Sequence, residues 1–322
     1  MEMLALTPIQ QLNFPLVGNT VFVKRDDLLP FSFGGNKARK AVLFFREIIT
    51  GRYDCVVTYG TNSSNHCRII ANMAAMHGLP CYVVSPETVG RMTANSRIID
   101  VLGASVILSH LSEVGTTIRT VLQDLENQGC NPYFIPGGGH GNLGTQAYVD
   151  CYEEIRTQER ILGLHFDFIF LPSGTGTTQA GLVCGKLVHG DDTEIVGISI
   201  ARRNPRGRQV VVDSVLDYLE SRKLSFNVTG SVQFVDDYVV EGYGSYNNEI
   251  LEVIRTVFIN DGIALDTTYT GKAFWGMQRY LKEHGITCKN VLFIHTGDTP
   301  LFFDDLEGLT HEVGLSFTKK YS

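Results

Sequence analysis

The stretch FDFIFLPSGTGTTQAGLVCGKLV, residues 166–188, places an apolar run, a glycine loop and a second apolar segment in direct succession. The largely apolar run at 166–171 predicts a buried strand, and 178–188 predicts a helix. Glycines at the junction allow a tight turn between the two. A strand that passes through a short loop into a helix is typical of α/β folds with parallel sheets.

The same alternation continues on both sides of this stretch. Expected strands cover residues 21–23, 54–58, 80–85, 104–108, 132–136, 195–200, 231–235 and 290–294. Expected helices cover residues 36–50, 64–77, 93–102, 116–127, 143–161, 209–219, 248–261 and 271–284. Because ligands bind beyond the carboxyl ends of strands in such sheets, we expect loops 60–65, 173–178 and 296–299 to share one cleft. The glycine triplet at 137–139 suggests a crossing between two sheet domains.

Composition excludes several classes of protein. The 322 residues are 43% hydrophobic and 19% charged with a net charge of −7, which is typical of a soluble globular protein large enough for two domains. No long basic run is present, which argues against nucleic acid or an acidic membrane surface as a partner. We find no signal peptide and no span for a bilayer. Seven cysteines without CxxC spacing predict no disulfide framework and no metal site, and they indicate the reducing cytosol.

The glycine loop at 173–181 is a candidate phosphate site. Backbone N–H groups at a helix N-terminus bind phosphate, and glycines allow its close approach. The alternative is a turn that merely needs glycine. A dinucleotide fingerprint fails at Gln179, although Arg202 and Arg203 could serve a 2′-phosphate, and a nucleotide P-loop fails at 185–187.

Lys37 lies in the run FGGNKARK, residues 33–40, at the point where a loop turns into a helix. This position would fix the direction of its side chain. The alternative is a solvated basic helix start. The field of a helix N-terminus lowers the pKa of a lysine, which suits an amine that reacts with a carbonyl group. Lys37 and the phosphate loop together suggest a phosphorylated aldehyde cofactor, pyridoxal 5′-phosphate.

The segment 61–66 follows an expected strand and opens an expected helix. Ser63 or Ser64 could simply cap that helix. The same amides and hydroxyls could instead bind a carboxylate, and His66 could donate a proton or be structural.

Five segments, in order along the chain, resemble D-cysteine desulfhydrase and 1-aminocyclopropane-1-carboxylate (ACC) deaminase. They are residues 33–40, 64–68, 173–181, 266–272 and 295–297, within a resemblance that covers roughly residues 20–303. These are pyridoxal-phosphate enzymes with the tryptophan synthase β-subunit fold, fold type II. The resemblance implies an α/β fold of two domains, each a mainly parallel twisted sheet flanked by helices. We expect a large cofactor-binding domain at 1–39 and 148–322, a small domain at 40–147, and the active site in the cleft between them.

The resemblance also implies roles for individual residues. Lys37 matches the lysine that bonds to the cofactor and then takes the Cα proton. The matching phosphate cup consists of Thr175, Gly176, Thr177 and Thr178. Catalytic positions besides Lys37 are Ser64, Tyr243 and Tyr269, and substrate-binding positions are Ser64, Asn65, His66, Tyr243 and Tyr269. Asn65 would also lie beside the cofactor ring, and Thr270 would face its pyridine nitrogen.

Thr270 and His66 favour the desulfhydrase over the deaminase, which carries Glu and Gln at these positions. A threonine gives the pyridine nitrogen no negative charge, so a carbanion at Cα is less stabilised. The sequence thus predicts a lyase that eliminates a Cβ substituent from a small amino acid, with D-cysteine giving pyruvate, sulfide and ammonia. Asp298 and His140 depart from the family pattern, so the substrate stays open.

Alternative functions remain at this stage. On the same scaffold they are ACC deamination, β-replacement and racemisation. Outside catalysis, a small-ligand-binding protein could retain the phosphate cup, although the intact Lys37 weighs against it. A homodimer is expected from the resemblance.

Overall fold

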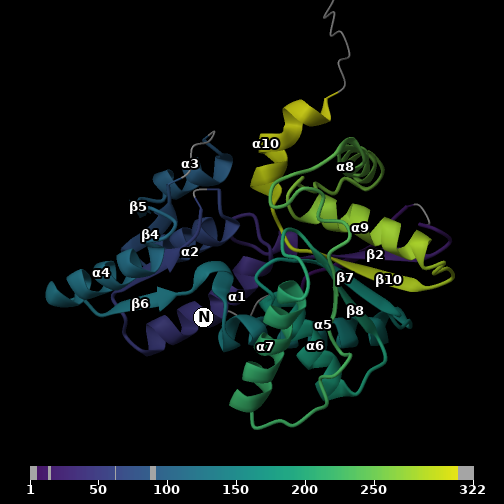
Figure 1. Cartoon of the computed structure of the whole chain (residues 1–322), viewed down its shortest axis with the longest axis horizontal. Coiled ribbons are helices and arrows are strands. Elements are labelled where there is room, and N and C mark those ends of the chain that lie inside the picture. Colours follow the sequence, from purple (N-terminus) through teal and green to yellow (C-terminus); the bar gives the residue numbers. More distant parts are fainter. Residues whose placement is uncertain (1–5, 14–15, 62, 88–91, 311–322) are drawn as a thin grey trace, which may run out of the picture.

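The computed structural model describes residues 6–13, 16–61, 63–87 and 92–310, so the expectation for Asn62 lies outside the described residues. Strands and helices alternate along most of this length (Figure 1). The strands are β1 (Ile9–Gln11), β2 (Thr20–Arg25), β3 (Cys55–Tyr59), β4 (Cys81–Pro86), β5 (Ser105–Ser109), β6 (Pro132–Ile135), β7 (Phe168–Ser173), β8 (Glu194–Ser199), β9 (Gln233–Val235) and β10 (Asn290–His295). The 3₁₀ turns are η1 (Asp26–Leu28) and η2 (Gly137–Gly139). The α-helices are α1 (Asn36–Thr50), α2 (Asn65–Met76), α3 (Ala94–Val101), α4 (Val114–Asn127), α5 (Asn142–Leu162), α6 (Thr177–His189), α7 (Arg206–Ser221), α8 (Asn248–Asp261), α9 (Thr270–Glu283) and α10 (Thr299–Leu309).

Within the described residues the strands form a six-stranded and a four-stranded sheet. The larger has the order β1-β2-β10-β7-β8-β9, and the smaller has the order β5-β4-β3-β6. All neighbouring strands pair in parallel except β1, which runs antiparallel to β2. Parallel neighbours need crossover connections, and the helices between successive strands supply them. The fold class expected from the sequence is therefore confirmed.

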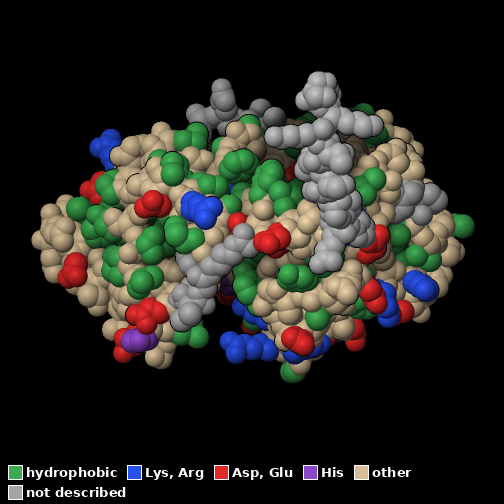
Figure 2. Space-filling view, turned by 90° about the horizontal axis from the view of Figure 1, so that it is seen from above, with side chains coloured by type: hydrophobic (Ala, Val, Ile, Leu, Met, Phe, Trp, Pro, Cys, Tyr) green, Lys and Arg blue, Asp and Glu red, His purple; other side chains and the backbone are tan. Residues whose placement is uncertain are grey.

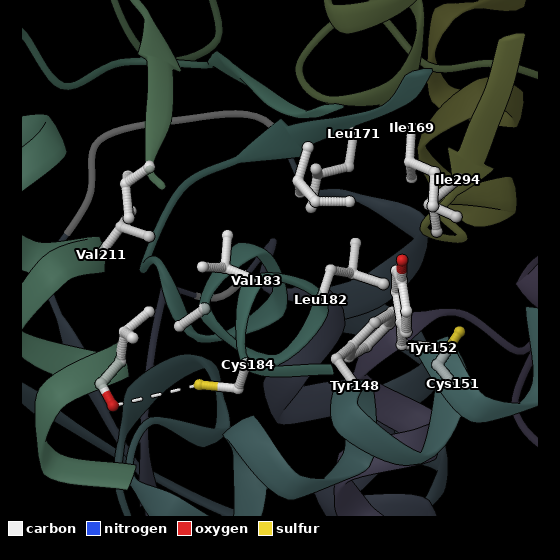
Figure 3. Close-up of a cluster of buried hydrophobic side chains, with 14 of the residues drawn as sticks. Tyr148, Cys151, Tyr152, Ile169, Leu171, Leu182, Val183, Cys184, Val211 and Ile294 are labelled. Atoms are coloured by element: carbon white, nitrogen blue, oxygen red, sulfur yellow. Dashed lines mark hydrogen bonds between the residues drawn. The ribbon is translucent and has the colours of Figure 1, made fainter. Parts of the chain in front are cut away.

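The inner strands of each sheet are buried on both faces, to which successive side chains point in turn, whereas the edge strand β5 of the smaller sheet is largely exposed. In β10, Leu292 and Ile294 pack with α5, α6 and α7, whereas Val291 and Phe293 pack with α8 and α9. Figure 3 shows the first of these layers, where Leu182 and Val183 of α6 meet Ile169 and Leu171 of β7. In the smaller sheet, α1 and α2 cover one face and α4 covers the other.

The glycine triplet lies between the two sheets, as expected. It forms η2, which follows β6 of the smaller sheet and precedes α5, a helix packed on α6 beside the larger sheet. The helices α1 and α5 both run across the predicted domain boundaries at residues 39/40 and 147/148. The division into domains at these residues stays a prediction.

The expected strand at 166–171 is shifted in the structure. The strand β7 is paired from Phe168 to Ser173, because its ladder with β8 begins at Phe168 opposite Glu194. The sequence analysis also missed β1 and α10. Both lie outside the alternating pattern from which the other elements were predicted.

No helix in the described ranges is long and apolar enough to cross a membrane. On the face drawn in Figure 2, basic and acidic side chains occur in small groups interspersed with polar and hydrophobic ones.

Candidate active site

A cavity of about 540 Å³ lies where the carboxyl ends of strands from both sheets meet. Its lining includes Tyr59 at the end of β3, Pro136 after β6, Ser173 at the end of β7, Ile200 after β8 and Thr296 after β10. The three loops expected to share a cleft all contribute residues to it. The volume is in the range of small-molecule and cofactor sites.

The glycine pair before Lys37 is required by close packing rather than by the lysine itself. Gly35 has φ +100°, and a Cβ there would lie 2.5 Å from the Thr296 carbonyl oxygen. Gly34 has φ +60°, and a Cβ there would meet the Asp27 carbonyl oxygen at 2.4 Å. The start of α1 is thereby pressed against the loop after β10, where the backbone N–H of Asn36 donates to the Thr296 carbonyl at 2.9 Å.

Lys37, the second residue of α1, reaches the cavity wall. Its Nζ donates to the Gly138 carbonyl at 3.2 Å. Burial lowers its pKa to about 8, against the opposing effect of the Asp298 carboxylate. A larger share of Lys37 is therefore neutral, and able to react with an aldehyde, than for an ordinary lysine near neutral pH.

Lys40 lies on the same face of α1, since residues three apart on a helix are neighbours. It is buried, and its Nζ donates to Thr177 Oγ1 at 2.6 Å and to the Gly138 carbonyl at 3.5 Å. Burial, followed by repulsion from Lys37, holds its pKa well below the usual value. No carboxylate of the described residues lies within ion-pair distance of it. An anion bound at the start of α6 would favour the protonated form of this buried amine, and the two would attract each other.

The loop between β7 and α6 has the geometry expected of a phosphate cup. Gly176 has φ +98° and directly precedes α6, whose first backbone N–H groups have no partner within the helix. Thr175, Gly176 and Thr178 line the cavity. Asn36 Nδ2 donates to Thr178 Oγ1 at 3.1 Å, so α1 and α6 are linked at the cup.

These residues fit pyridoxal phosphate. The cavity offers the Lys37 amine with its lowered pKa for the aldehyde, a helix start with the buried Lys40 amine beneath it for the phosphate, and apolar and polar walls between them. Lys37 would hold the aldehyde, and the loop from Gly174 to Thr178 would hold the phosphate.

The start of α2 forms the opposite wall. Ser64 caps this helix, with Oγ accepting from the Cys67 backbone N–H at 3.3 Å, and it also lines the cavity. Asn65 is held from two sides, because its Oδ1 accepts from Arg68 and Asn95 and its Nδ2 donates to Asp298 Oδ1. The amide orientation of Asn65 is therefore fixed.

His66 is a neutral side chain in this wall. Its Nε2 lies 2.8 Å from Thr58 Oγ1, whose hydroxyl already donates to the Ile135 carbonyl, so Nε2 carries the proton. Burial and the nearby Lys37 and Lys40 hold its pKa well below the usual value. The proton on Nε2 is engaged with Thr58.

Tyr243 and Tyr269 meet at the cavity, as the sequence predicts for two active-site tyrosines. Their hydroxyl oxygens are 2.5 Å apart, and their rings pack edge to face with centroids 5.9 Å apart. Burial raises the pKa of both phenols. One hydroxyl donates to the other, which leaves one phenolic proton for a ligand.

Two predicted cofactor residues do not line the cavity. Thr177 is buried against Lys40. Thr270 is buried with its hydroxyl donating to Asp266 Oδ1 at 2.8 Å, and the Asp266 carboxylate also accepts the first N–H groups around the start of α9. The roles predicted for both threonines stay predictions.

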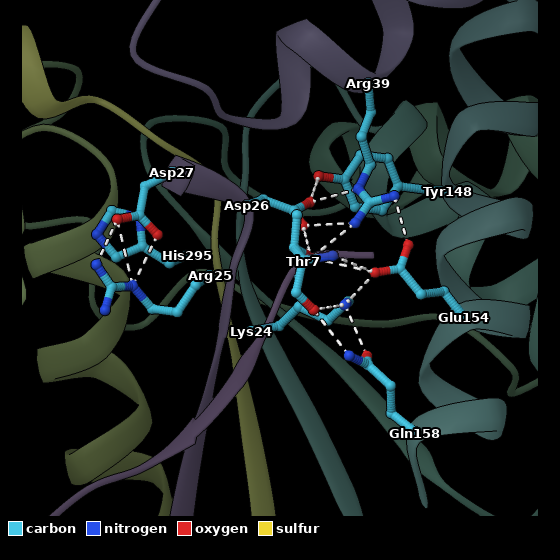
Figure 4. A network of polar contacts seen from close by, with 10 residues as sticks. All are labelled: Thr7, Lys24, Arg25, Asp26, Asp27, Arg39, Tyr148, Glu154, Gln158 and His295. Atoms are coloured by element: carbon cyan, nitrogen blue, oxygen red, sulfur yellow. Dashed lines mark hydrogen bonds and ion pairs between the residues drawn. The ribbon is translucent and has the colours of Figure 1, made fainter. Parts of the chain in front are cut away.

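A buried ionic network links α1 to η1 and α5, and through α5 to β2 of the larger sheet (Figure 4). Arg39 binds Asp26 through two hydrogen bonds of 2.8 Å and Glu154 through another of 2.8 Å. Lys24 and Tyr148 complete the network. Burial alone would raise the pKa of Asp26, but Arg39 and Lys24 lower it to about 2.

Three residues of the cavity region carried no expected role, namely Asn36, Lys40 and Asp298. Arg202 was considered only for a 2′-phosphate, whereas in the structure its Nη1 donates to the Gly174 carbonyl. The spacing of three residues between Lys37 and Lys40 was the available signal for Lys40. Asp298 was visible only as a departure from the family pattern.

Comparisons with known proteins agree with this geometry. The family model described as "Pyridoxal-phosphate dependent enzyme" matches residues 3–297. D-cysteine desulfhydrase of Salmonella newport (strain SL254) is 30% identical over 300 residues, which cover 89% of each chain. The crystal structure of an ACC deaminase homologue has a TM-score of 0.85 and 30% identity, covering 94% of this chain and 92% of that one. O-acetyl serine sulfhydrylase isoform 3 from Entamoeba histolytica shares the fold, with a TM-score of 0.67, 17% identity, and coverage of 95% and 90%.

These findings confirm the predicted fold type, the cofactor pyridoxal 5′-phosphate and a lyase that depends on it. The chain therefore belongs to the family of pyridoxal-phosphate dependent enzymes.

Proposed function

We propose that this enzyme catalyses α,β-elimination from a small amino acid, most like D-cysteine desulfhydration to pyruvate, sulfide and ammonia. The observation that supports it most is the Lys37 amine, with its pKa lowered to about 8, in a cavity between a phosphate-type loop and the start of α2. The 30% identity with D-cysteine desulfhydrase supports the choice of reaction.

The residues of the cavity have separate roles in this reaction. Pyridoxal phosphate, when bound, supplies the electron sink that makes the substrate Cα–H bond acidic. Lys37 Nζ accepts the Cα proton as general base. Ser64 and the N-terminal amides of α2 hold the substrate carboxylate, and Asn65 fixes the position of the cofactor ring. The Tyr243–Tyr269 pair orients the substrate.

The decisive experiment is an assay of keto-acid release across D- and L-cysteine, D-serine, β-chloroalanine, cysteate and ACC. We expect activity on at least one β-substituted amino acid, and Lys37→Ala should lose both that activity and the visible absorption band of the bound cofactor. A wild-type protein that stays colourless after incubation with pyridoxal phosphate would refute the enzyme and favour a small-ligand-binding protein.

ACC deamination is the second candidate, because a 30% identical structural neighbour is titled an ACC deaminase homologue. Thr270 argues against it, since this position carries no carboxylate. Keto-acid release from ACC but not from β-chloroalanine would favour the deaminase. Trapping of added thiols as new amino acids would favour β-replacement.

We also propose that the chain forms a homodimer and functions in the cytosol. The family resemblance suggests the dimer, and seven free thiols fit a reducing compartment. Light scattering on the purified protein gives its mass directly, and a monomer at micromolar concentration would contradict the dimer.

A further inference from the structure

Asp298 occupies an unusual backbone position at the wall of the cavity. It lies between β10 and α10 and has φ +82°, a left-handed conformation that favours glycine. Few residues other than glycine adopt this conformation, although aspartate does so more readily than most, and such backbone positions tend to persist at functional sites. Asp298 is also the one carboxylic acid among the described residues that line the cavity.

The carboxyl group of Asp298 is buried, and only one of its two oxygens accepts a hydrogen bond within the described residues. The side chain is 6% exposed, and Oδ1 accepts from Asn65 Nδ2. Oδ2 has no hydrogen-bond partner in the described part of the chain. A buried polar atom without a hydrogen-bond partner lowers the stability of the folded protein. Asp298 has such an atom in addition to its unusual backbone conformation, and the two together call for an explanation.

The surroundings of Asp298 favour its neutral form, chiefly through burial. Burial raises its pKa well above the usual value, and the like charge of Asp266 adds to this effect. Lys37 and Arg68 are the cations that oppose it. When the Lys37 amine carries no proton, one of these two opposing charges is lost, and the neutral carboxyl group is favoured further.

We propose that Asp298 is a catalytic acid of this enzyme, donating the proton of its carboxyl group to the Cβ substituent as that substituent leaves. The inference rests on the proposed elimination. The Cα proton passes to Lys37 Nζ, the Cα–H electrons form the new Cα–Cβ double bond, and the Cβ–X bond breaks with its electron pair on X. The Asp298 proton bonds to X, which departs as HX. Transfer of a proton from the Lys37 ammonium to the Asp298 carboxylate then restores both groups.

The pairing with Lys37 couples the two proton transfers. Once Lys37 gains the Cα proton, its positive charge lowers the pKa of the nearby Asp298 and makes that acid readier to donate. The other candidate acids are weaker. The Tyr243 and Tyr269 phenols have raised pKa values, and the Nε2 proton of His66 is engaged by Thr58.

The test varies the leaving group. A hydroxyl group leaves only with a proton, a thiol leaves more readily as its anion, and chloride needs no proton. Loss of a general acid typically costs 10²–10⁴-fold in rate. In Asp298→Asn we expect kcat for elimination from serine to fall by about 10²–10⁴-fold. The fall in kcat for cysteine should be smaller, and kcat for β-chloroalanine should fall by less than about tenfold. The exposed Asp237→Asn serves as the matched control and should leave all three rates unchanged.

Two further measurements separate an acid from a structural residue. Wild-type kcat for serine should fall at high pH as Asp298 loses its proton, and this limb should be absent for β-chloroalanine. In the cofactor-loaded proteins, the infrared difference between wild type and Asp298→Asn should contain the carbonyl band of a neutral carboxylic acid. Asp298→Gly, which suits the local φ, should show the same substrate pattern even if the asparagine variant folds poorly.

The outcomes are distinct. An equal loss on all three substrates would mean that Asp298 only positions Asn65 or the cofactor, and an unchanged rate on serine would mean that it donates no proton; either overturns the inference. A wild-type enzyme that cannot eliminate chloride from either enantiomer of β-chloroalanine would overturn the proposed function itself.

Discussion

Two amines on one helix face have different surroundings, and these surroundings define their roles. Lys37 has its Nζ at the cavity wall near Gly138, whereas Lys40 is fully buried against Thr177. Each pKa is lowered chiefly by burial, yet only Lys37 is close enough to Asp298 for an opposing effect. Lys37, which we propose as the reactive amine, is thus distinguished from Lys40 by its position at the cavity wall.

The pKa of Lys37 predicts how cofactor attachment depends on pH. Because burial disfavours the ammonium form, the neutral amine should predominate above about pH 8 in the cofactor-free protein. We therefore expect the rate of covalent attachment of pyridoxal phosphate to rise with pH through a midpoint near 8. Stopped-flow absorbance over a pH series measures this, and a midpoint near 10.5, the value of an ordinary lysine, would contradict it.

At the scale of elements, the start of α1 is positioned from two directions. Its glycine pair packs against the backbone of η1 and of the loop after β10, and Arg39 ties the helix to the Asp26 side chain of η1 and to α5. Lys37 lies between these attachments. Displacement of α1 should therefore disturb the cavity before it unfolds the protein.

Gly35→Ala tests the first attachment. The new Cβ would lie 2.5 Å from the Thr296 carbonyl oxygen at a φ of +100°, so the start of α1 must shift. We expect loss of the covalent cofactor band together with destabilisation by more than about 2 kcal/mol, the combined effect of strain and overpacking. Gly78→Ala is the control, because Gly78 has φ +67° in open space and should cost only about 1 kcal/mol with the cofactor band intact. Equal effects of the two variants on the band would refute this role of packing.

Arg39→Ala tests the second attachment. It leaves the Asp26 and Glu154 carboxylates buried without their main partner, so we expect a loss of about 3–5 kcal/mol in the free energy of unfolding. Arg160→Ala is the control, because it removes an exposed ion pair in which Arg160 lies 3.9 Å from Glu153. It should lower the free energy of unfolding by under about 1 kcal/mol. Urea unfolding at pH 7 measures both.

The same network gives the stability a pH dependence. The folded pKa of Asp26 is lowered to about 2, so its contribution is complete above its unfolded value of about 3.9 and is lost as pH falls through 2. Wild type should lose stability steeply between about pH 4 and 2, and Arg39→Ala should lose less over that interval. Parallel curves for the two proteins would contradict the assignment.

Most of the helices and strands could be predicted because each shows a periodic pattern of apolar residues and is bounded by residues typical of loops. The helix α1 was predicted with its observed bounds, and the loop before α6 was predicted as a candidate anion site from its glycines and its place between a strand and a helix N-terminus. The three-residue strand β1 has too few residues to show an alternation, so only its pairing with β2 defines it. The helix α10 carries a start signal in Pro300, which the sequence analysis did not use. The contacts of Lys40, Asn65 and Asp298 depend on segments far apart in the chain, so no local pattern could give them.

At the scale of the whole molecule, the cavity joins the two sheets. Gly60, Ser64 and His140 come from segments beside the smaller sheet, whereas Thr175 and Thr296 follow strands of the larger one. A ligand in this position contacts both and should stabilise both. Binding to the folded state alone adds roughly 2.7 kcal/mol at a hundredfold excess over Kd.

Hydrogen exchange can test whether the cofactor couples the two sheets. Pyridoxal phosphate should slow exchange at residues 60–61, 63–66 and 136–140 as well as at 173–178 and 296–298, because all these segments contribute residues to one cavity. Pyridoxal, which lacks the phosphate, should still protect the region around Lys37 but protect 173–178 less. Lys40→Met removes the buried amine beside Thr177. It should weaken the binding of pyridoxal phosphate about 10–100-fold and leave that of pyridoxal nearly unchanged, since a hydrogen bond to a charged group such as the phosphate contributes about 1.5–3 kcal/mol. Protection by pyridoxal phosphate confined to the larger sheet would mean that the cavity does not couple the two sheets.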